Sequence, residues 1–238
     1  MNAPWIVGNW KLHGDRPKLL QFSQVFADRK QSIALSVPAT LLGTEYAIAL
    51  GAQDVSAHKH GAYTGEISAE MYLETGAKFS LIGHSERRQY HGETDASVNA
   101  KVLRCLSVNL LPVICVGETE SEFDAGRSAE VVRAQLLAAL DGVASDAEFV
   151  VAYEPVWAIG TGKSATAEIA QAVHAGIRAT LASICDEFAS KKILYGGSVK
   201  PENAKELLAQ PDINGALVGG ASLEIDSFAG IVAAAEEN

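Results

Sequence analysis

Several polar side chains with acid–base or charge-stabilising chemistry stand directly after short apolar runs in the sequence. Asn9 and Lys11 follow the run near residue 4, His84 follows the run at 79, and Glu154 follows the run at 149. A lysine ammonium in such a place could neutralise a phosphate group and the oxygen of a developing enolate. The alternative for an isolated lysine is an exposed surface position. The combination predicts acid–base chemistry on an anionic substrate.

His84 precedes the segment SERRQY, which we expect to form a helix with Ser85 as its N-cap. The positive end of a helix dipole disfavours an imidazolium ion, so a neutral ring is expected at this position. A neutral histidine could donate a hydrogen bond to a carbonyl or enediolate oxygen. A single histidine at a strand end can equally be structural, and its residue type alone leaves both roles open.

Glu154 stands immediately before Pro155, which favours an extended backbone and ends the strand at that point. Its carboxylate should therefore project into a cleft at the end of the strand. A carboxylate held in a partly dry cleft can act as a general base. A salt bridge is the alternative role for a partly buried glutamate.

Glycine-rich turns could hold an anion although the chain has a formal net charge of −10. Ser198 ends a GGS motif, Gly219 and Gly220 follow the last apolar run, and Gly160 lies in a further glycine-rich stretch. Backbone N–H groups in such turns can bind phosphate, and a helix N-terminus adds to the same local field. Together with Lys11, these N–H groups could bind an anion without a basic protein surface.

The segment 155–165 is apolar and then glycine-rich, as expected for a loop that could cover a site. Its last part, GTGKSA, matches the loose dinucleotide fingerprint and resembles a nucleotide-binding P-loop. Both patterns fail on context, because Trp157 stands where the P-loop needs a glycine and EPVWAI separates the first glycine from the strand. An ordinary long turn is the other interpretation of this segment.

Eight short apolar runs alternate with longer segments of helical spacing, which predicts strands alternating with helices. Helical spacing is clear over 128–140, 166–182 and 202–208. Because this alternation favours a parallel sheet, and eight units suit closure, we predict an α/β fold: a single (β/α)₈ barrel domain over residues 1–238. The polar residues that follow the runs would then lie where barrel enzymes have their active sites.

Composition and charge exclude several classes of partner. The net charge of −10 argues against binding nucleic acid, which requires a basic face. No stretch is long enough to span a bilayer without charges, so no membrane partner is expected. The three cysteines lack metal-ligand spacing and fit a reducing compartment, which predicts a cytoplasmic protein.

A metal site is not expected either. His58 and His60 could place two imidazoles on one side of an extended segment, but no third ligand is evident nearby. A zinc site needs three or four protein ligands. We therefore interpret both as solvated loop histidines and predict neither a metal nor a cofactor.

Seven motifs in register resemble those of triosephosphate isomerases over nearly the whole chain. They are GNWK at 8–11, GAYTGE at 61–66, GHSERR at 83–88, CVGE at 115–118, AYEPVWAIGTGK at 152–163, YGGSV at 195–199 and ALVGGASL at 216–223. The resemblance implies a cofactor-independent isomerase of glycolysis and gluconeogenesis. Such an enzyme interconverts dihydroxyacetone phosphate and D-glyceraldehyde 3-phosphate by proton transfer through an enediolate.

The resemblance also implies a role for each candidate residue. Glu154 would carry the proton between C1 and C2, His84 would polarise the carbonyl group, and Lys11 would stabilise charge. Asn9 would help to orient the enediolate, with Glu86 and Ser85 as supporting residues. The phosphate group would be bound by residues of the glycine-rich turns: Gly160, Ser198, Gly219 and Gly220.

The family is dimeric, so the resemblance implies a homodimer. The loop GAYTGE would project from one subunit and place Thr64 near Lys11 and His84 of the partner subunit. The chain departs from the family at Leu12 and His13, where members often read MN, and in a shorter segment between about 26 and 51. Neither departure removes a catalytic group.

Two other functions stay open on the residues alone. The first is another phosphate-binding barrel, such as a metal-dependent aldolase or a sugar-phosphate epimerase, which a metal requirement would reveal. The second is a non-catalytic sugar-phosphate-binding protein. Such a protein could keep the glycines but would not need Glu154 and Lys11 together.

Overall fold

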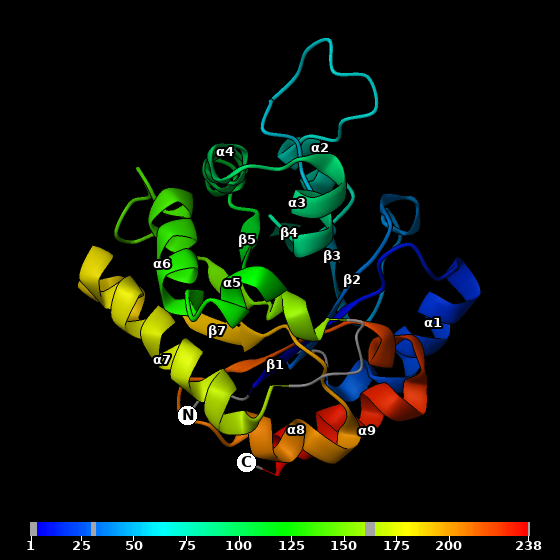
Figure 1. The fold of residues 1–238 in the computed structure, drawn as a ribbon. Coiled ribbons are helices and arrows are strands. Elements are labelled where there is room, and N and C mark those ends of the chain that lie inside the picture. The colour runs from blue at the N-terminus through cyan, green and yellow to red at the C-terminus, as the bar shows by residue number, and fades with distance from the viewer. Residues whose placement is uncertain (1–3, 30–31, 160–164, 238) are drawn as a thin grey trace.

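Eight parallel strands close into a barrel in the computed structural model, which describes residues 4–29, 32–159 and 165–237. Each strand pairs with its neighbour in the sequence, and β8 pairs with β1 to complete the ring (Figure 1). The strands are β1 (Trp5–Asn9), β2 (Ile33–Ser36), β3 (Ala49–Ala52), β4 (Phe79–Ile82), β5 (Leu111–Val116), β6 (Val150–Tyr153), β7 (Lys192–Tyr195) and β8 (Gly215–Val218). The predicted barrel is thereby confirmed.

The strands are buried on both faces, which explains their nearly continuous apolar sequences. One apolar cluster fills the interior of the barrel and includes Val7, Leu81 and Val113. A second, larger cluster lies between the barrel and the surrounding helices and includes Trp10, Phe22 and Ile177. Alternate residues of each strand therefore contribute to the two clusters, as the pleat of a strand requires.

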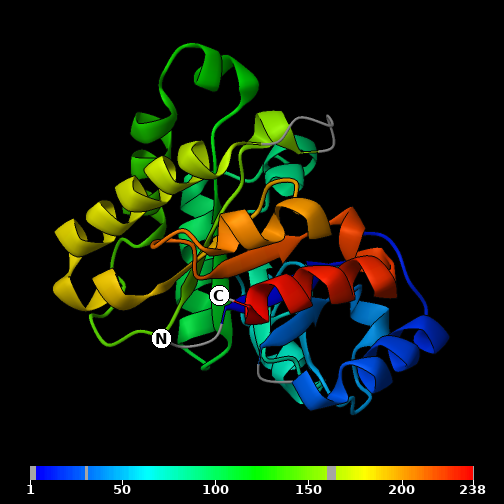
Figure 2. The ribbon, with the colours of Figure 1, turned by 90° about the horizontal axis from the view of Figure 1, so that it is seen from below.

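Nine α-helices in the described ranges surround the barrel, and α8 and α9 pack side by side on its outside (Figure 2). The helix expected over 166–182 begins one residue later, because Thr166 is its N-cap and accepts a hydrogen bond from the Ile169 N–H at 3.3 Å. None of the described helices is long and apolar enough to cross a membrane. The helices are α1 (Arg16–Val25), α2 (Ala69–Glu74), α3 (Ser85–His91), α4 (Asp95–Leu106), α5 (Glu120–Asp124), α6 (Ser128–Ala139), α7 (Ala167–Ile184), α8 (Pro201–Leu208) and α9 (Ile225–Glu236).

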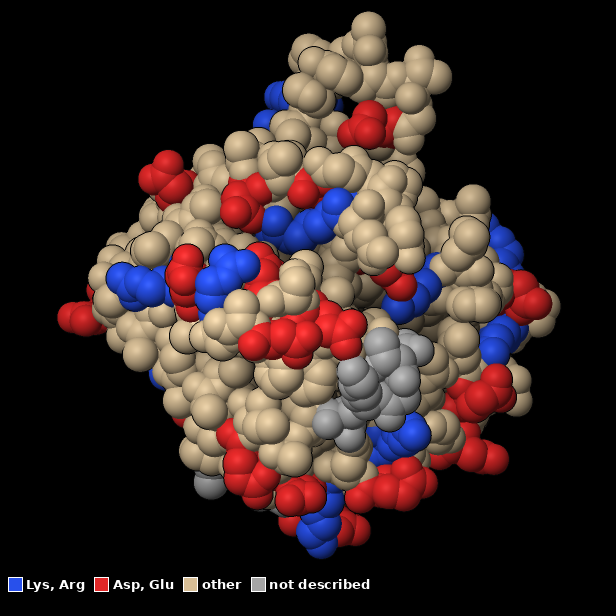
Figure 3. All heavy atoms as spheres, viewed as in Figure 1, with Lys and Arg blue, Asp and Glu red and all other residues tan. Residues whose placement is uncertain are grey.

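The segment between β3 and α2 leaves the barrel as a protruding loop, coloured cyan at the top of Figure 1. Its residues 58–66 are exposed, and the rings of His58 and Tyr63 stack at 3.8 Å. Most of the atoms on this protrusion belong to neither basic nor acidic residues (Figure 3). The loop thus exposes uncharged surface, including an aromatic ring, away from the core.

Candidate active site

A cavity of about 250 Å³ opens at the carboxyl ends of the strands. Seven of the candidate residues come together here from five strand ends. Those that line the cavity are Asn9, Lys11, His84, Glu154, Ser198, Gly219 and Gly220. Gly160 and most of the glycine-rich stretch around it lie outside the described residues.

Glu154 follows β6, and its backbone N–H donates to the carbonyl of Val116 at 2.7 Å. Its carboxylate is buried and has two partners: Nε2 of His84 lies 2.9 Å from Oε1, and the Ser85 N–H donates to Oε2 at 2.8 Å. Burial alone would raise the pKa of Glu154, but the His84 ring and the Ser85 N–H outweigh it and lower the pKa. The carboxylate is therefore ionised at neutral pH, as a general base must be.

His84 is itself the N-cap of α3, so the expectation that Ser85 has this role is wrong. Nδ1 of His84 accepts a hydrogen bond from the Glu86 N–H at 3.2 Å, in the way that a capping oxygen would. Ser85 is the first residue of the helix, and its backbone N–H is directed at Glu154 instead. Both catalytic candidates thus depend on the first N–H groups of α3, which have no partners within the helix.

The proton of the His84 ring is located by this capping hydrogen bond. Burial lowers the pKa of His84, whereas the charge of Glu154 raises it, and the net direction is upward. The Glu86 N–H acts against protonation, because Nδ1 must be unprotonated to accept its hydrogen. A neutral ring then carries its hydrogen on Nε2, the nitrogen that faces Glu154.

Lys11 lies in a turn after β1, where its φ of 50° is unusual for a residue with a side chain. Its N–H donates to Oδ1 of Asn9 at 3.0 Å, and its Nζ lies 2.6 Å from Oε1 of Glu86. A Cβ atom built on Gly219 would lie 3.7 Å from Cε of Lys11. The lysine therefore extends across the cavity between α3 and the glycines that follow β8.

The turns after β7 and β8 form the other side of the cavity. Oγ of Ser198 donates to the carbonyl of Ala158 at 3.0 Å, which ties the first turn to the segment after β6. No heavy atom lies within 4 Å of a Cβ built on Gly220, so an anion has room to approach that backbone. With the Lys11 ammonium nearby, these turns can hold a phosphate group.

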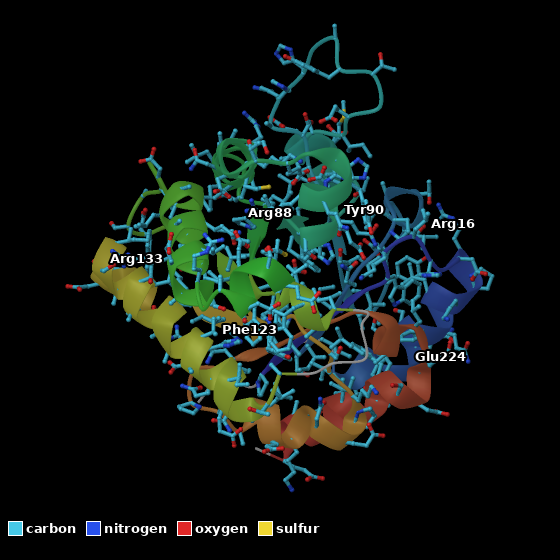
Figure 4. All side chains as sticks on the ribbon, viewed as in Figure 1. Arg16, Arg88, Tyr90, Phe123, Arg133 and Glu224 are labelled. Atoms are coloured by element: carbon cyan, nitrogen blue, oxygen red, sulfur yellow. The ribbon has the colours of Figure 1, made fainter. Side chains whose placement is uncertain are left out.

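The motif CVGE supports Glu154 from β5. A Cβ on Gly117 would lie 1.8 Å from the Glu154 carbonyl oxygen, so only glycine fits at this position. Glu118 is buried, and its Oε1 accepts hydrogen bonds from the hydroxyl of Tyr153 and the indole of Trp157, at 3.0 and 2.9 Å. The Trp157 ring also stacks on Phe123 of α5 at 4.2 Å (Figure 4 labels Phe123). These contacts fix the chain on both sides of Glu154.

Sequence reasoning missed three residues that hold the site together: Trp10, Gln53 and Ser222. The amide of Gln53 donates to the Lys11 carbonyl, and the indole of Trp10 donates to the Ser222 carbonyl. Gln53 follows β3 directly, so the rule that singled out His84 and Glu154, a polar residue after an apolar run, would have found it. Trp10 and Ser222 carry no such local signal.

The other two histidines considered in the sequence and the loop residue Thr64 lie outside the cavity. His58 and His60 are exposed, and no set of three or more His, Cys, Asp or Glu side chains could hold a metal ion in the ranges that the structure describes. Thr64 is exposed in the protruding loop and does not reach the cavity of its own chain.

Comparison with known proteins gives one consistent result. The family model for triosephosphate isomerase matches residues 4–235. The triosephosphate isomerase of Herminiimonas arsenicoxydans is 47% identical over 99% of this chain and 100% of its own length. The protein of the same name from Paracidovorax citrulli is 51% identical over 97% of this chain and 97% of its own length. That from Psychromonas ingrahamii is 49% identical over 99% of this chain and 100% of its own length.

Proposed function

The chain belongs to the triosephosphate isomerase family, and from this premise we propose how the residues at the barrel mouth carry out its reaction. The enzyme interconverts dihydroxyacetone phosphate and D-glyceraldehyde 3-phosphate, an aldose–ketose isomerisation of glycolysis and gluconeogenesis. A proton moves between C1 and C2 of the triose through an enediolate. The observation that carries the proposed residue roles is the meeting of Asn9, Lys11, His84 and Glu154 in one cavity.

Glu154 is the base in this proposal. Its ionised carboxylate takes the proton from C1 of dihydroxyacetone phosphate, and the electrons of the broken C–H bond form a C1–C2 double bond while the carbonyl oxygen becomes negative. The same carboxyl group then returns a proton to C2. Its lowered pKa favours the ionised form in which the cycle begins and ends.

In this proposal His84 hydrogen-bonds to the two oxygens of the triose, O1 and O2, and transfers a proton between them. Its Nε2–H hydrogen-bonds to the oxygen on which charge develops, and the hydroxyl proton moves from O1 to O2 by way of this nitrogen. The 2.9 Å contact between His84 and Glu154 must be replaced by contacts with the substrate. Separation from the carboxylate weakens the largest influence that raises the pKa of His84, and burial, with the nearby Lys11 charge, acts in favour of the neutral donor.

The phosphate group is held on the opposite side of the cavity. Backbone N–H groups near Ser198, Gly219 and Gly220 surround it, and the Lys11 ammonium neutralises part of its charge. Asn9 orients the enediolate, and Glu86 holds the Lys11 ammonium at 2.6 Å. Gly160 is proposed as a further phosphate ligand from the family resemblance alone. A local field of this kind accounts for anion binding by a chain of net charge −10.

We also propose that residues 1–238 act as one domain and that two copies associate through the protruding loop. Support comes from the exposed, mostly uncharged surface of residues 58–66 and from the family resemblance of GAYTGE. A cytoplasmic location is proposed because Cys105, Cys115 and Cys185 are free thiols.

Turnover of glyceraldehyde 3-phosphate by the purified chain, coupled to a dehydrogenase that consumes dihydroxyacetone phosphate, tests the proposed function. We expect isomerisation that is unchanged by exhaustive treatment of the protein with a chelator before the assay. Activity that is lost and then restored by a divalent ion would assign the chain to a metal-dependent barrel. A folded protein that binds the substrate without turnover would be a binding protein.

A further inference from the structure

The backbone of Lys11 is in a strained conformation. Its φ of 50° lies in the left-handed region, and Lys11 and Asn109 are the two non-glycine residues with positive φ in the described part of the chain. For a residue with a Cβ this conformation is unfavourable, because the Cβ comes too close to the following carbonyl oxygen. Such strain persists where neighbouring groups hold the backbone in place. The direction in which the Lys11 side chain leaves the turn therefore depends on what holds the turn.

Two side chains hold this turn through hydrogen bonds to its backbone. Oδ1 of Asn9 accepts from the Lys11 N–H at 3.0 Å, within the turn itself. Nε2 of Gln53 donates to the Lys11 carbonyl at 2.8 Å and to the Ser36 carbonyl at 3.3 Å. Ser36 ends β2 and Gln53 follows β3, so one amide group joins the turn after β1 to the ends of the next two strands along the chain.

Gln53 is itself firmly placed. Asp54, the next residue, lies 2.6 Å from Nζ of Lys101 in α4 and 2.8 Å from Nη2 of Arg87 in α3. Val55, which follows, is buried in the core. The backbone at Gln53 therefore cannot follow a displaced Lys11 turn without breaking contacts to two helices.

We propose that Gln53 is a positioning residue of the isomerase. Its amide acts through the Lys11 carbonyl to keep the left-handed turn, and the turn directs the ammonium group into the cavity. Without this hydrogen bond the turn can relax, and the ammonium moves away from the place where charge develops. The inference rests on the proposed role of Lys11 in catalysis.

Three variants test the inference. Gln53→Met keeps the length of the side chain and removes the donor, so we expect kcat/KM to fall by ~10- to 100-fold, the effect of a misplacement near 1 Å. Inhibition by inorganic phosphate should weaken in the same variant. Gln171→Met is the matched control, because Gln171 also bonds through its amide, to Asp212 at 2.7 Å, but lies outside the cavity. This control should keep wild-type kinetics.

Gln53→Glu adds a readout that general destabilisation would not produce. An ionised carboxylate at this position would set its oxygens against the carbonyls of Lys11 and Ser36, whereas a protonated carboxyl group can donate one hydrogen bond. Activity relative to wild type should therefore rise as the pH falls through the pKa of the new carboxyl group. Gln53→Met should show no such recovery.

Assays at protein concentrations where all variants have the same oligomeric state separate the possible outcomes. The inference is overturned if kcat/KM of Gln53→Met stays within twofold of wild type, or if the pH profile of Gln53→Glu runs parallel to that of wild type. Should Gln53→Met fail to fold, the pH profile decides alone. A wild-type chain without isomerase activity would instead refute the proposed function.

Discussion

The indole N–H of Trp10 donates a hydrogen bond to the carbonyl oxygen of Ser222 at 3.1 Å and joins the turn after β1 to the turn after β8. Both side chains are buried. The N–H and Oγ of Ser222 in turn both donate to the Gly219 carbonyl, at 2.8 and 2.7 Å. The glycines proposed to bind phosphate are therefore fixed to the same strand end that carries Asn9 and Lys11.

Ser222→Ala should weaken substrate binding more than it slows the chemical step. It removes one of two hydrogen bonds to the Gly219 carbonyl, and such a bond contributes about 1 kcal/mol, or roughly fivefold in an equilibrium constant. We expect KM and the inhibition constant of inorganic phosphate to rise together by about this factor, with kcat within about twofold of wild type. A fall in kcat at unchanged KM would show that Ser222 does not act through the phosphate group.

Thr64→Glu should weaken the proposed dimer. Thr64 is exposed in the protruding loop of one chain, and in the dimer it would lie near Lys11 and His84 of the partner subunit. A carboxylate buried at such an interface loses its hydration, so association should weaken and specific activity should fall on dilution. Sedimentation and activity over a dilution series measure both effects.

Ser145→Glu is the control for that experiment, because Ser145 is also exposed but lies in the connection between α6 and β6. It should leave both association and activity unchanged. An unchanged dimer in the Thr64 variant, or a fully active wild-type monomer, would contradict the proposed assembly.

His174 should make the protein less stable in acid. It is buried in α7, its Nδ1 lies 2.7 Å from the Ala170 carbonyl, and burial lowers its pKa to about 4. Between pH 6.5 and about 4 the unfolded chain binds a proton that the folded chain does not, so acidification favours unfolding across this window. At the acidic end the loss is about 3 kcal/mol.

His174→Leu removes this proton, so its free energy of unfolding should fall less steeply than that of wild type between pH 6.5 and 4. Urea unfolding at a series of pH values measures the free energy of unfolding of both proteins. The contributions of the other titrating groups cancel when one free energy is subtracted from the other. Parallel curves would show that the His174 ring binds its proton equally in the folded and the unfolded chain, so that burial does not lower its pKa.

Much of the fold could be predicted from the sequence because each strand is buried on both faces and therefore reads as an apolar run. All four residues of β6 are buried, for example, and the polar residue that follows them is Glu154. The rule that places polar residues at strand ends singled out the same residues that now line the cavity. Periodicity and strand-end position are local properties, which a single sequence displays directly.

The features of the site that the sequence does not predict depend on contacts between distant parts of the chain. Gln53 and Lys11 are 42 residues apart, and Trp10 and Ser222 are 212 apart, so no local pattern indicates either pair. The expectation of Ser85 as the N-cap of α3 is wrong because serine is the more usual capping residue, whereas here the ring nitrogen of His84 accepts the hydrogen bond. The backbone N–H of its neighbour Ser85 consequently donates a hydrogen bond to the Glu154 carboxylate.

The role of Glu154 as the base is the central claim, and Glu154→Gln tests it because the amide has the shape of the carboxylate but cannot accept the proton. The measurement is isomerisation of dihydroxyacetone phosphate in D₂O, with deuterium at C2 of the product followed by NMR. Glu148→Gln is the control, since Glu148 is exposed and pairs with Lys191 at 2.8 Å, outside the cavity.

Wild type and the Glu148 variant should form product at the same rate, with solvent deuterium at C2, because the proton on the carboxyl group exchanges with water. The Glu154 variant should keep the fold and lose both isomerisation and labelling by ~10²- to 10⁴-fold. Isomerisation and labelling at the wild-type rate in a folded Glu154→Gln protein would contradict the account and assign the proton transfer to another group.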